Sequence, residues 1–157
     1  MDIHIGLTEQ QRDEITSGLY KLLADSYALY IKTHSFHWNV TGLHFSTLHK
    51  LFDEQYTELA KAIDEIAERI RALGAFVPAS FSQFNKLTTI TEEPGVPLTT
   101  NMIQQLLDGQ EEVVRTARHL MPILEAAHDA PSVDLVTRRM LEHEKNGWML
   151  RSMLEEN

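Results

Sequence analysis

Cysteine is absent from this 157-residue chain, and proline and glycine are scarce, with five and seven copies. Without cysteine there is no disulfide framework, no cysteine-based zinc site, no iron–sulfur cluster and no thiol catalysis. Long apolar runs are missing too, since no stretch approaches the roughly 20 residues that span a bilayer. The first residues, MDIHIGLTEQ, lack the pattern of a signal peptide. We therefore expect one soluble, cytoplasmic domain over residues 1–157, with no membrane contact.

Positive charge is also in short supply, because 14 Lys and Arg stand against 23 Asp and Glu and give a formal net charge of −9. Such a surface repels nucleic-acid phosphate and anionic lipid. The length suffices for a single domain to bury a real core. What the composition does offer is eight histidines, the one hint of chemistry in the residue counts.

The apolar residues recur with a helical period, and the alternation typical of strands is missing. The pattern predicts four long helices, at about residues 9–37, 44–73, 100–128 and 131–155. Thr8 and Gln11 fit a capping box for the first helix, Gly74 stops the second, and Pro131 opens the fourth. The connection over 75–98 is too long for a tight turn, and its SFSQFNKL piece indicates a short extra helix. Short, long and short connections are typical of an all-α, ferritin-like four-helix bundle with one long crossover.

The second expected helix carries two adjacent stripes of side chains. One is apolar and predicts the core face: Phe45, Leu48, Phe52, Leu59, Ile63, Ile66, Ile70 and Leu73. The other contains His49, Asp53, Asp64 and Glu68, residue types that bind metals, and small residues on the same face would let another helix approach closely. The ligand-type stripe does not face the bundle's own core.

The spacing of these four residues predicts where a metal would sit. His49 and Asp53 are one turn apart, as are Asp64 and Glu68, so each pair can converge on one ion. Asp53 and Asp64 are 11 residues apart, roughly 16 Å along a helix, so the pairs cannot share an ion within one chain. The residue numbers of His49 and Glu68 add to the same sum as those of Asp53 and Asp64. If two copies of this helix pack antiparallel about a point near residues 58–59, His49 therefore lies opposite Glu68, and Asp53 opposite Asp64. An antiparallel pair of these helices about a two-fold axis therefore predicts two equivalent intersubunit sites.

A further ligand is expected from the first helix, because a short turn brings its last turn, with His37, back beside His49. Imidazole and carboxylate with open positions suit Fe(II) better than calcium or structural zinc. Taken singly, His37 is more often a core or surface histidine, and Asp64 and Glu68 more often a solvated face. Their joint pattern favours a di-iron arrangement. A lone Glu-x-x-His motif, Glu125 to His128, is interpreted as surface, since a ferritin-type intrachain site needs that motif on two helices.

The segment HSFHWNVTGLHFSTLHKLFDEQYTELAKAIDEIAERIRALG resembles the signature of the Dps family, the miniferritins known for protecting DNA during starvation. The similarity extends through HEKNGWMLRSML near the C-terminus, and its most specific parts are HWN, LHxxxD and DExAER. The resemblance implies a hollow homo-dodecamer of four-helix subunits. It implies a ferroxidase with two irons per centre that uses hydrogen peroxide in preference to dioxygen and stores ferric mineral. The catalytic ligands would be His37, His49 and Asp53 of one subunit with Asp64 and Glu68 of the partner subunit, and zinc would compete for them.

The resemblance also implies auxiliary roles. Trp38 and Trp148 match family tryptophans near the centre that scavenge oxidising equivalents, although large core or interface aromatics would look the same. His143 matches an extra histidine that some similar proteins bring to the metal, with an interface histidine as the alternative. Asp129 and Asp134 resemble residues lining the pores through which iron enters, and caps of a helix N-terminus are the alternative.

DNA binding is expected to be weak or absent, although the family is named for it. Members that bind DNA usually do so through tails rich in Lys and Arg, whereas MDIHIGL contains neither and the chain ends Leu154-Glu155-Glu156-Asn157. Twelve copies of a −9 chain would carry a formal charge of −108. The alternative function is a nucleoid-associated protein that protects DNA by coating it, and a third is a bundle whose metal site is structural or holds zinc.

Overall fold

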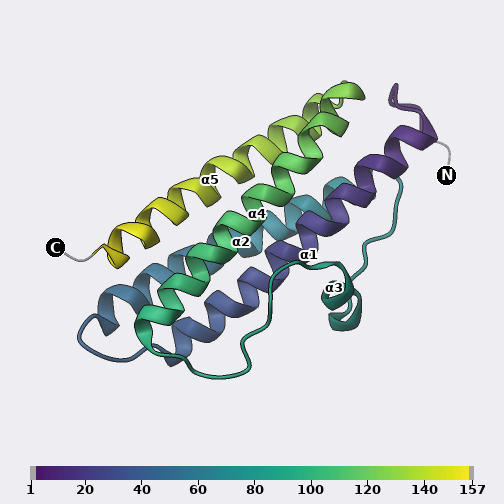
Figure 1. Ribbon diagram of the computed structural model, residues 1–157. Helices are drawn as coiled ribbons and strands as arrows, with labels where there is room; N and C mark the ends of the chain where they lie inside the picture. The colour runs from purple at the N-terminus through teal and green to yellow at the C-terminus, as the bar shows by residue number, and fades with distance from the viewer. Residues whose placement is uncertain (1–2, 156–157) are drawn as a thin grey trace.

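The computed structural model describes residues 3–155, and within them the secondary structure is entirely helical. Four long helices lie side by side along one axis, and the short α3 sits on the connection between α2 and α4 (Figure 1). The helices are α1 (Glu9–Asn39), α2 (Phe45–Ala72), α3 (Phe81–Leu87), α4 (Thr99–Ala126) and α5 (Ala130–Leu154). The expected four-helix bundle is confirmed, including the extra helix in the crossover. None of these helices is both long enough and apolar enough to cross a membrane.

The helix ends follow the local signals of the sequence. Thr8 accepts a hydrogen bond from the backbone of Gln11 and its own N–H donates to the Gln11 side chain at 2.8 Å, which completes the expected capping box. Gly74 follows α2 with φ +96°, a left-handed conformation that side chains rarely adopt. The N–H of Ala75 then bonds back to the carbonyl oxygen of Ile70, so the helix stops as predicted.

The start of α4 lies beside the turn that joins α1 to α2. The hydroxyl of Thr99 donates to the carbonyl oxygen of Thr41 at 3.0 Å. The crossover therefore returns along the length of the bundle, and α4 runs parallel to α2 (Figure 1). Pro122 does not end α4, which continues to Ala126. The residues after it, Glu125 and His128, are exposed, in agreement with their interpretation as surface residues.

The core is a single cluster of apolar side chains from all four long helices. On α2 the predicted core stripe is mostly confirmed, since six of its members are buried: Leu48, Phe52, Leu59, Ile66, Ile70 and Leu73. Phe45 was wrongly assigned to it, because this first residue of α2 is 43% exposed and its ring stacks on His49 at 5.1 Å instead. Ile63 is only partly buried against the cluster.

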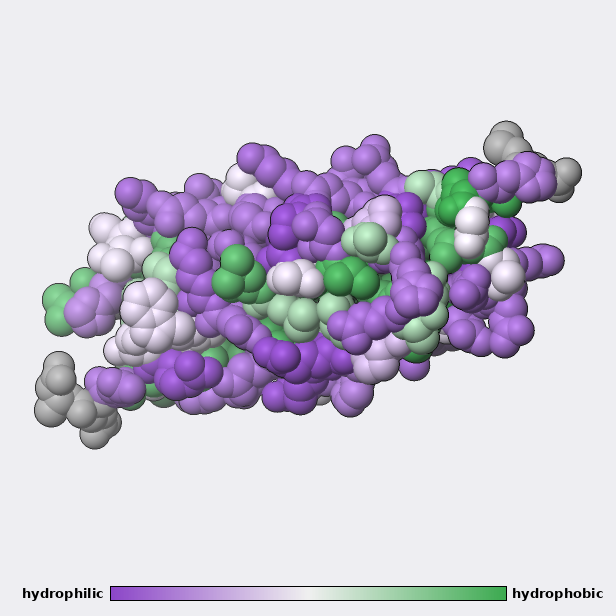
Figure 2. All heavy atoms as spheres, turned by 90° about the horizontal axis from the view of Figure 1, so that it is seen from above, coloured by the Kyte–Doolittle hydropathy of each residue, from purple (hydrophilic) through white to green (hydrophobic). Residues whose placement is uncertain are grey.

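Large apolar side chains also remain exposed on the single subunit. On the face seen in Figure 2, hydrophobic residues form a broken strip along the long axis, with hydrophilic residues on both sides. The exposed large apolar residues include Trp38, Leu43, Phe76, Phe81, Leu98, Leu141 and Trp148. Contiguous exposed apolar surface usually marks a surface that another molecule covers.

A buried carboxylate fastens the crossover to the bundle. Asp25 of α1 is fully buried and accepts hydrogen bonds from the hydroxyls of Thr88, Thr89 and Thr116 and from the backbone N–H of Thr89. Thr116 belongs to α4, so one carboxylate joins α1, α4 and the segment after α3. Since four donors meet one fully buried acceptor, these bonds are among the stronger polar contacts of the fold.

Replacing Asp25 with Ala is expected to lower the free energy of unfolding by roughly 2–4 kcal/mol, because three hydroxyl donors and one backbone N–H lose their acceptor together. Thr116→Val, which removes one donor, should cost about 1 kcal/mol. The exposed Asp13 on the same helix is the matched control, and Asp13→Ala should stay within about 0.5 kcal/mol of the wild type. Urea unfolding followed by circular dichroism measures all three. An Asp25→Ala variant as stable as the wild type would contradict the assignment.

Candidate metal centre

The predicted ligands His37 and His49 lie side by side where α1 ends and α2 begins. Their rings stack with centroids 3.8 Å apart. The Nδ1 of His37 lies 2.7 Å from the carbonyl oxygen of His49, and the Nδ1 of His49 lies 2.9 Å from the carbonyl oxygen of His37. A carbonyl oxygen can only accept a hydrogen bond, so each Nδ1 carries a proton, and Nε2 is the ring nitrogen left to bind a metal. A hydrogen bond from the other ring nitrogen to a backbone carbonyl is the outer contact that metal-binding histidines use.

Asp53 follows His49 by one turn of α2 and is half-buried. Its Oδ1 accepts a hydrogen bond from the hydroxyl of Tyr56 at 2.7 Å. The coulombic effect of Asp53 reaches His34, whose pKa is nevertheless lowered by burial and by His37. The structure therefore pairs the two imidazoles, while the Asp53 carboxylate, one turn farther along α2, is oriented by its own donor. A tyrosine beside Asp53 was not anticipated from the sequence, although its spacing of three residues was a usable signal.

Asp64 and Glu68 lie farther along α2 and are both exposed. Over residues 3–155, no group of three or more histidine and acidic side chains is close enough to hold a metal ion within one chain. His37, His49 and Asp53 therefore do not form such a group by themselves, and Asp64 lies 11 residues beyond Asp53 on α2. The meeting of the five predicted ligands across a two-fold interface remains a prediction.

The two tryptophans lie at the surface of the subunit. Trp38 is 65% exposed, and its ring packs against His34 with centroids 3.8 Å apart, next to the two stacked histidines. Trp148 on α5 is 63% exposed. Neither is a core aromatic, so that alternative is wrong for both. An interface position or a scavenging role remains for each.

His143 lies inside the subunit. It is buried, its Nδ1 is 2.5 Å from the side-chain oxygen of Gln110, and its Nε2 is 3.2 Å from a guanidinium nitrogen of Arg139. Burial, and secondarily the charge of Arg139, lowers the pKa of His143 to about 3, which keeps the ring neutral. Both ring nitrogens are engaged, so this arrangement offers a metal no free atom of His143. The interface alternative does not fit a residue buried within one chain either.

The arginine beside His143 was missed in the sequence. Arg139 is buried and donates from both terminal nitrogens to the carboxylate of Glu58, which connects α5 to α2. Its position one turn before His143 on the inner face of α5 was the available signal. A buried arginine with this partner is a structural ion pair, since breaking it would leave a charge without compensation.

The two acidic residues assigned to an iron pore differ in their surroundings. Asp129 is buried, pairs with Arg69 at 2.7 Å and accepts from the backbone N–H of Ser132, so it caps α5. This favours the capping alternative for Asp129. Asp134 has an exposed side chain and pairs with Arg138 at 3.1 Å, which leaves it accessible to solvent. Its pore role remains a prediction.

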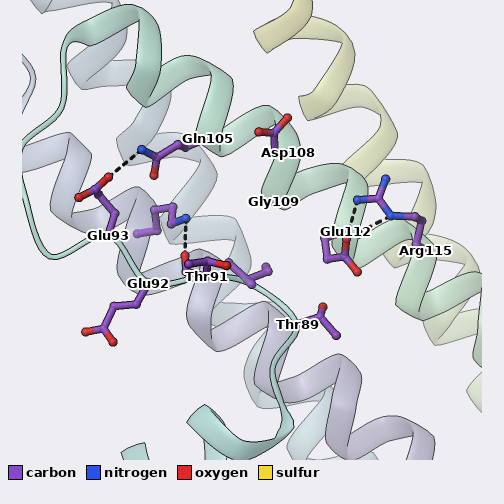
Figure 3. Close-up of a pocket in the computed structure, with 11 residues that line it drawn as sticks. Thr89, Thr91, Glu92, Glu93, Gln105, Asp108, Gly109, Glu112 and Arg115 are labelled. Carbon is purple, nitrogen blue, oxygen red and sulfur yellow. Dashed lines mark hydrogen bonds and ion pairs between the residues drawn. The ribbon is translucent and has the colours of Figure 1, made fainter.

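A pocket of about 340 Å³ lies between α1, the crossover and α4, away from the predicted ligands (Figure 3). Lys32 donates to the carbonyl oxygen of Thr91 at 2.7 Å, and Gln105 donates to Glu93 at 2.9 Å. Figure 3 shows Glu93 and Gln105 pointing toward one another, with a dashed line for the hydrogen bond between them. The polar side chains there fasten the crossover to its neighbours, and the pocket is not the metal centre.

Comparisons with known proteins bear on the family and the fold of this chain. The model of the ferritin-like domain matches residues 16–157. DNA protection during starvation protein 2 of Bacillus anthracis is 35% identical over 91% of this chain and 98% of its own length. A low temperature-induced protein of Nostoc is 41% identical over 98% of this chain and 87% of its own. The crystal structure of a Dps protein from Vibrio cholerae, described as a ferritin-like diiron-carboxylate protein, superposes with a TM-score of 0.91 at 30% identity. That similarity covers 98% of this chain and 100% of the other.

The buried His143 predicts a specific dependence of stability on pH. Its pKa in the fold is about 3, below the value of about 6.5 in an unfolded chain. The unfolded state therefore takes up a proton first as the pH falls through 6.5, and the fold loses up to about 1.4 kcal/mol per pH unit. His143→Gln should remove this component between pH 6.5 and 5, as measured by urea unfolding. His119→Gln, at an exposed histidine, is the control and should keep the wild-type dependence of the free energy of unfolding on pH. If His143→Gln also keeps that dependence, the prediction is wrong.

Proposed function

This chain belongs to the Dps family of ferritin-like proteins, and we propose that it is a ferroxidase and iron store whose centres form between subunits. The observation that carries the proposal is the reciprocal hydrogen bonding of His37 and His49. It leaves the two Nε2 atoms without a hydrogen-bond partner among residues 3–155, and the Asp53 carboxylate lies one turn after His49 on α2. Iron is the substrate of this site.

The ligand set would be completed by a second copy of the chain. His37, His49 and Asp53 of one subunit would face Asp64 and Glu68 of the partner subunit. Two Fe(II) ions would give one electron each to hydrogen peroxide, which takes up two protons and yields two waters and two Fe(III). Releasing water rather than a hydroxyl radical requires both electrons to arrive together, hence two irons per centre. The carboxylates favour the product because hard oxygen ligands suit Fe(III).

The assembly we propose is a homo-dodecamer in the cytoplasm, with the ferric mineral stored inside. The exposed apolar side chains, such as Leu43 at 94% and Trp148 at 63%, support burial against other copies. The ligand division along α2 requires contact between at least two copies. Dioxygen is the alternative oxidant, and zinc is a competitor for the same imidazole and carboxylate ligands.

Anaerobic addition of Fe(II) followed by hydrogen peroxide should give ferric absorbance at about one peroxide per two irons. His49→Ala with Asp53→Ala should reduce this fast oxidation at least about 100-fold, because the site loses two of its five ligands. His119→Ala, at an exposed histidine of α4, should behave as the wild type. Unchanged oxidation in the double variant would favour a structural or zinc site, and hydroxyl-radical production would contradict a paired centre.

Mixing two inactive variants tests whether the site is shared between subunits. One variant carries Ala at His49 and Asp53, and the other carries Ala at Asp64 and Glu68. After co-refolding, about one site in four should receive all its ligands from two intact halves. About a quarter of wild-type oxidation should therefore return. A mixture as inactive as its components would show that the ligands are not shared.

The second candidate function is DNA coating, since several relatives, including the one from Bacillus anthracis, are named for DNA protection during starvation. The net charge of −9 per chain argues against it, because binding to DNA is dominated by cationic neutralisation of phosphate. A gel-shift assay at moderate salt without divalent metal should show no complex. Strong binding under these conditions would make DNA coating the better account.

A further inference from the structure

We propose that Tyr56 is a positioning residue for the metal centre, which fixes the Asp53 carboxylate so that it binds iron through one oxygen. This inference rests on the proposed function, because it concerns a carboxylate assigned there as a ligand. Tyr56 itself does not belong to the five predicted ligands. It would act through Asp53.

The first support is the hydrogen bond from the phenol to the carboxylate. The hydroxyl of Tyr56 donates to Oδ1 of Asp53 at 2.7 Å, a short bond of the kind that a charged acceptor makes. A tyrosine phenol has an ordinary pKa of about 10, so it carries its proton and acts as a donor at neutral pH.

The second support is the packing that immobilises the phenol ring. The ring stacks on His34 with centroids 4.2 Å apart, and meets the ring of His37 at 5.2 Å and 66°. Tyr30 contacts it edge-on at 6.0 Å. Because aromatic neighbours lie on several sides, the hydroxyl cannot swing away from Asp53 without disturbing them. The same ring limits the movement of His37, so one residue restrains ligands from both α1 and α2.

The consequence concerns the coordination of the metal. With Oδ1 occupied by the phenol, Oδ2 is the oxygen left without a hydrogen-bond donor within the described part of the chain. Asp53 bound through Oδ2 alone would not chelate a single ion with both oxygens. Coordination positions would then stay open for the second iron and the oxidant. Outer hydrogen bonds of this kind typically change metal affinity by about 10- to 100-fold.

The test is Tyr56→Phe, which removes the hydroxyl and keeps the ring. The assembled protein would be titrated with Co(II) in place of Fe(II), and the visible absorption of cobalt would report both affinity and coordination. We expect affinity for Co(II) to fall about 10-fold or more, with a changed absorption envelope, while the urea midpoint of unfolding stays within the error of the wild type. Tyr30→Phe, which removes a hydroxyl from the same aromatic group without touching Asp53, should titrate as the wild type.

Asp53→Ala separates the failure of this inference from the failure of the proposed function. If Asp53→Ala binds Co(II) as the wild type does, the assigned centre is wrong. If Asp53→Ala abolishes binding while Tyr56→Phe keeps wild-type affinity and spectrum, the positioning role alone is overturned. Equal losses in Tyr56→Phe and Tyr30→Phe would also overturn it, because they would reflect packing rather than the hydrogen bond.

Discussion

Two hydrogen bonds cross in opposite directions between the last turn of α1 and the first turns of α2, from each Nδ1 of His37 and His49 to the other residue's carbonyl oxygen. They connect two helices through the very side chains assigned to iron, so the tautomer of each histidine is set by the fold itself. Each backbone carbonyl oxygen accepts a hydrogen bond from an Nδ1–H, and the Nε2 atoms remain for a metal. Asp53 is placed by the same junction, because it lies one turn after His49 on an unbroken helix.

The straightness of α2 imposes the next constraint. The helix runs without interruption from Phe45 to Ala72, so Asp53 and Asp64 share a face but stay roughly 16 Å apart along it. No movement of side chains closes that distance. A ligand set that includes all five predicted residues would therefore need a second chain, and under the proposed function assembly and iron chemistry would depend on the same surface of α2. Exposed apolar residues at the α1–α2 turn, such as Trp38 and Leu43, are typical of a surface that another molecule covers.

Aspartate and histidine residues elsewhere in the bundle make structural hydrogen bonds and ion pairs instead. Asp25 holds the crossover, Asp129 caps α5 and pairs with Arg69, and His143 lies neutral between Gln110 and Arg139. The difference from the candidate centre is whether the polar atoms already have protein partners. At His143 both ring nitrogens are occupied, whereas His37 and His49 each retain one. Residue type alone could not make this distinction.

The sequence by itself determined the helices, their ends and the division of the ligands. Capping at Thr8, the stop at Gly74 and the spacing of His49, Asp53, Asp64 and Glu68 act within one or two turns, and local backbone geometry transmits them directly. Only the tertiary structure decided what each polar side chain touches. The burial of His143 and Asp25, the exposure of Phe45 and the donor on Asp53 depend on which neighbours the long crossover brings alongside. Those neighbours come from distant parts of the chain, and they set the burial and the hydrogen bonds of each polar side chain. The helical periodicity of the sequence does not show which neighbours these are.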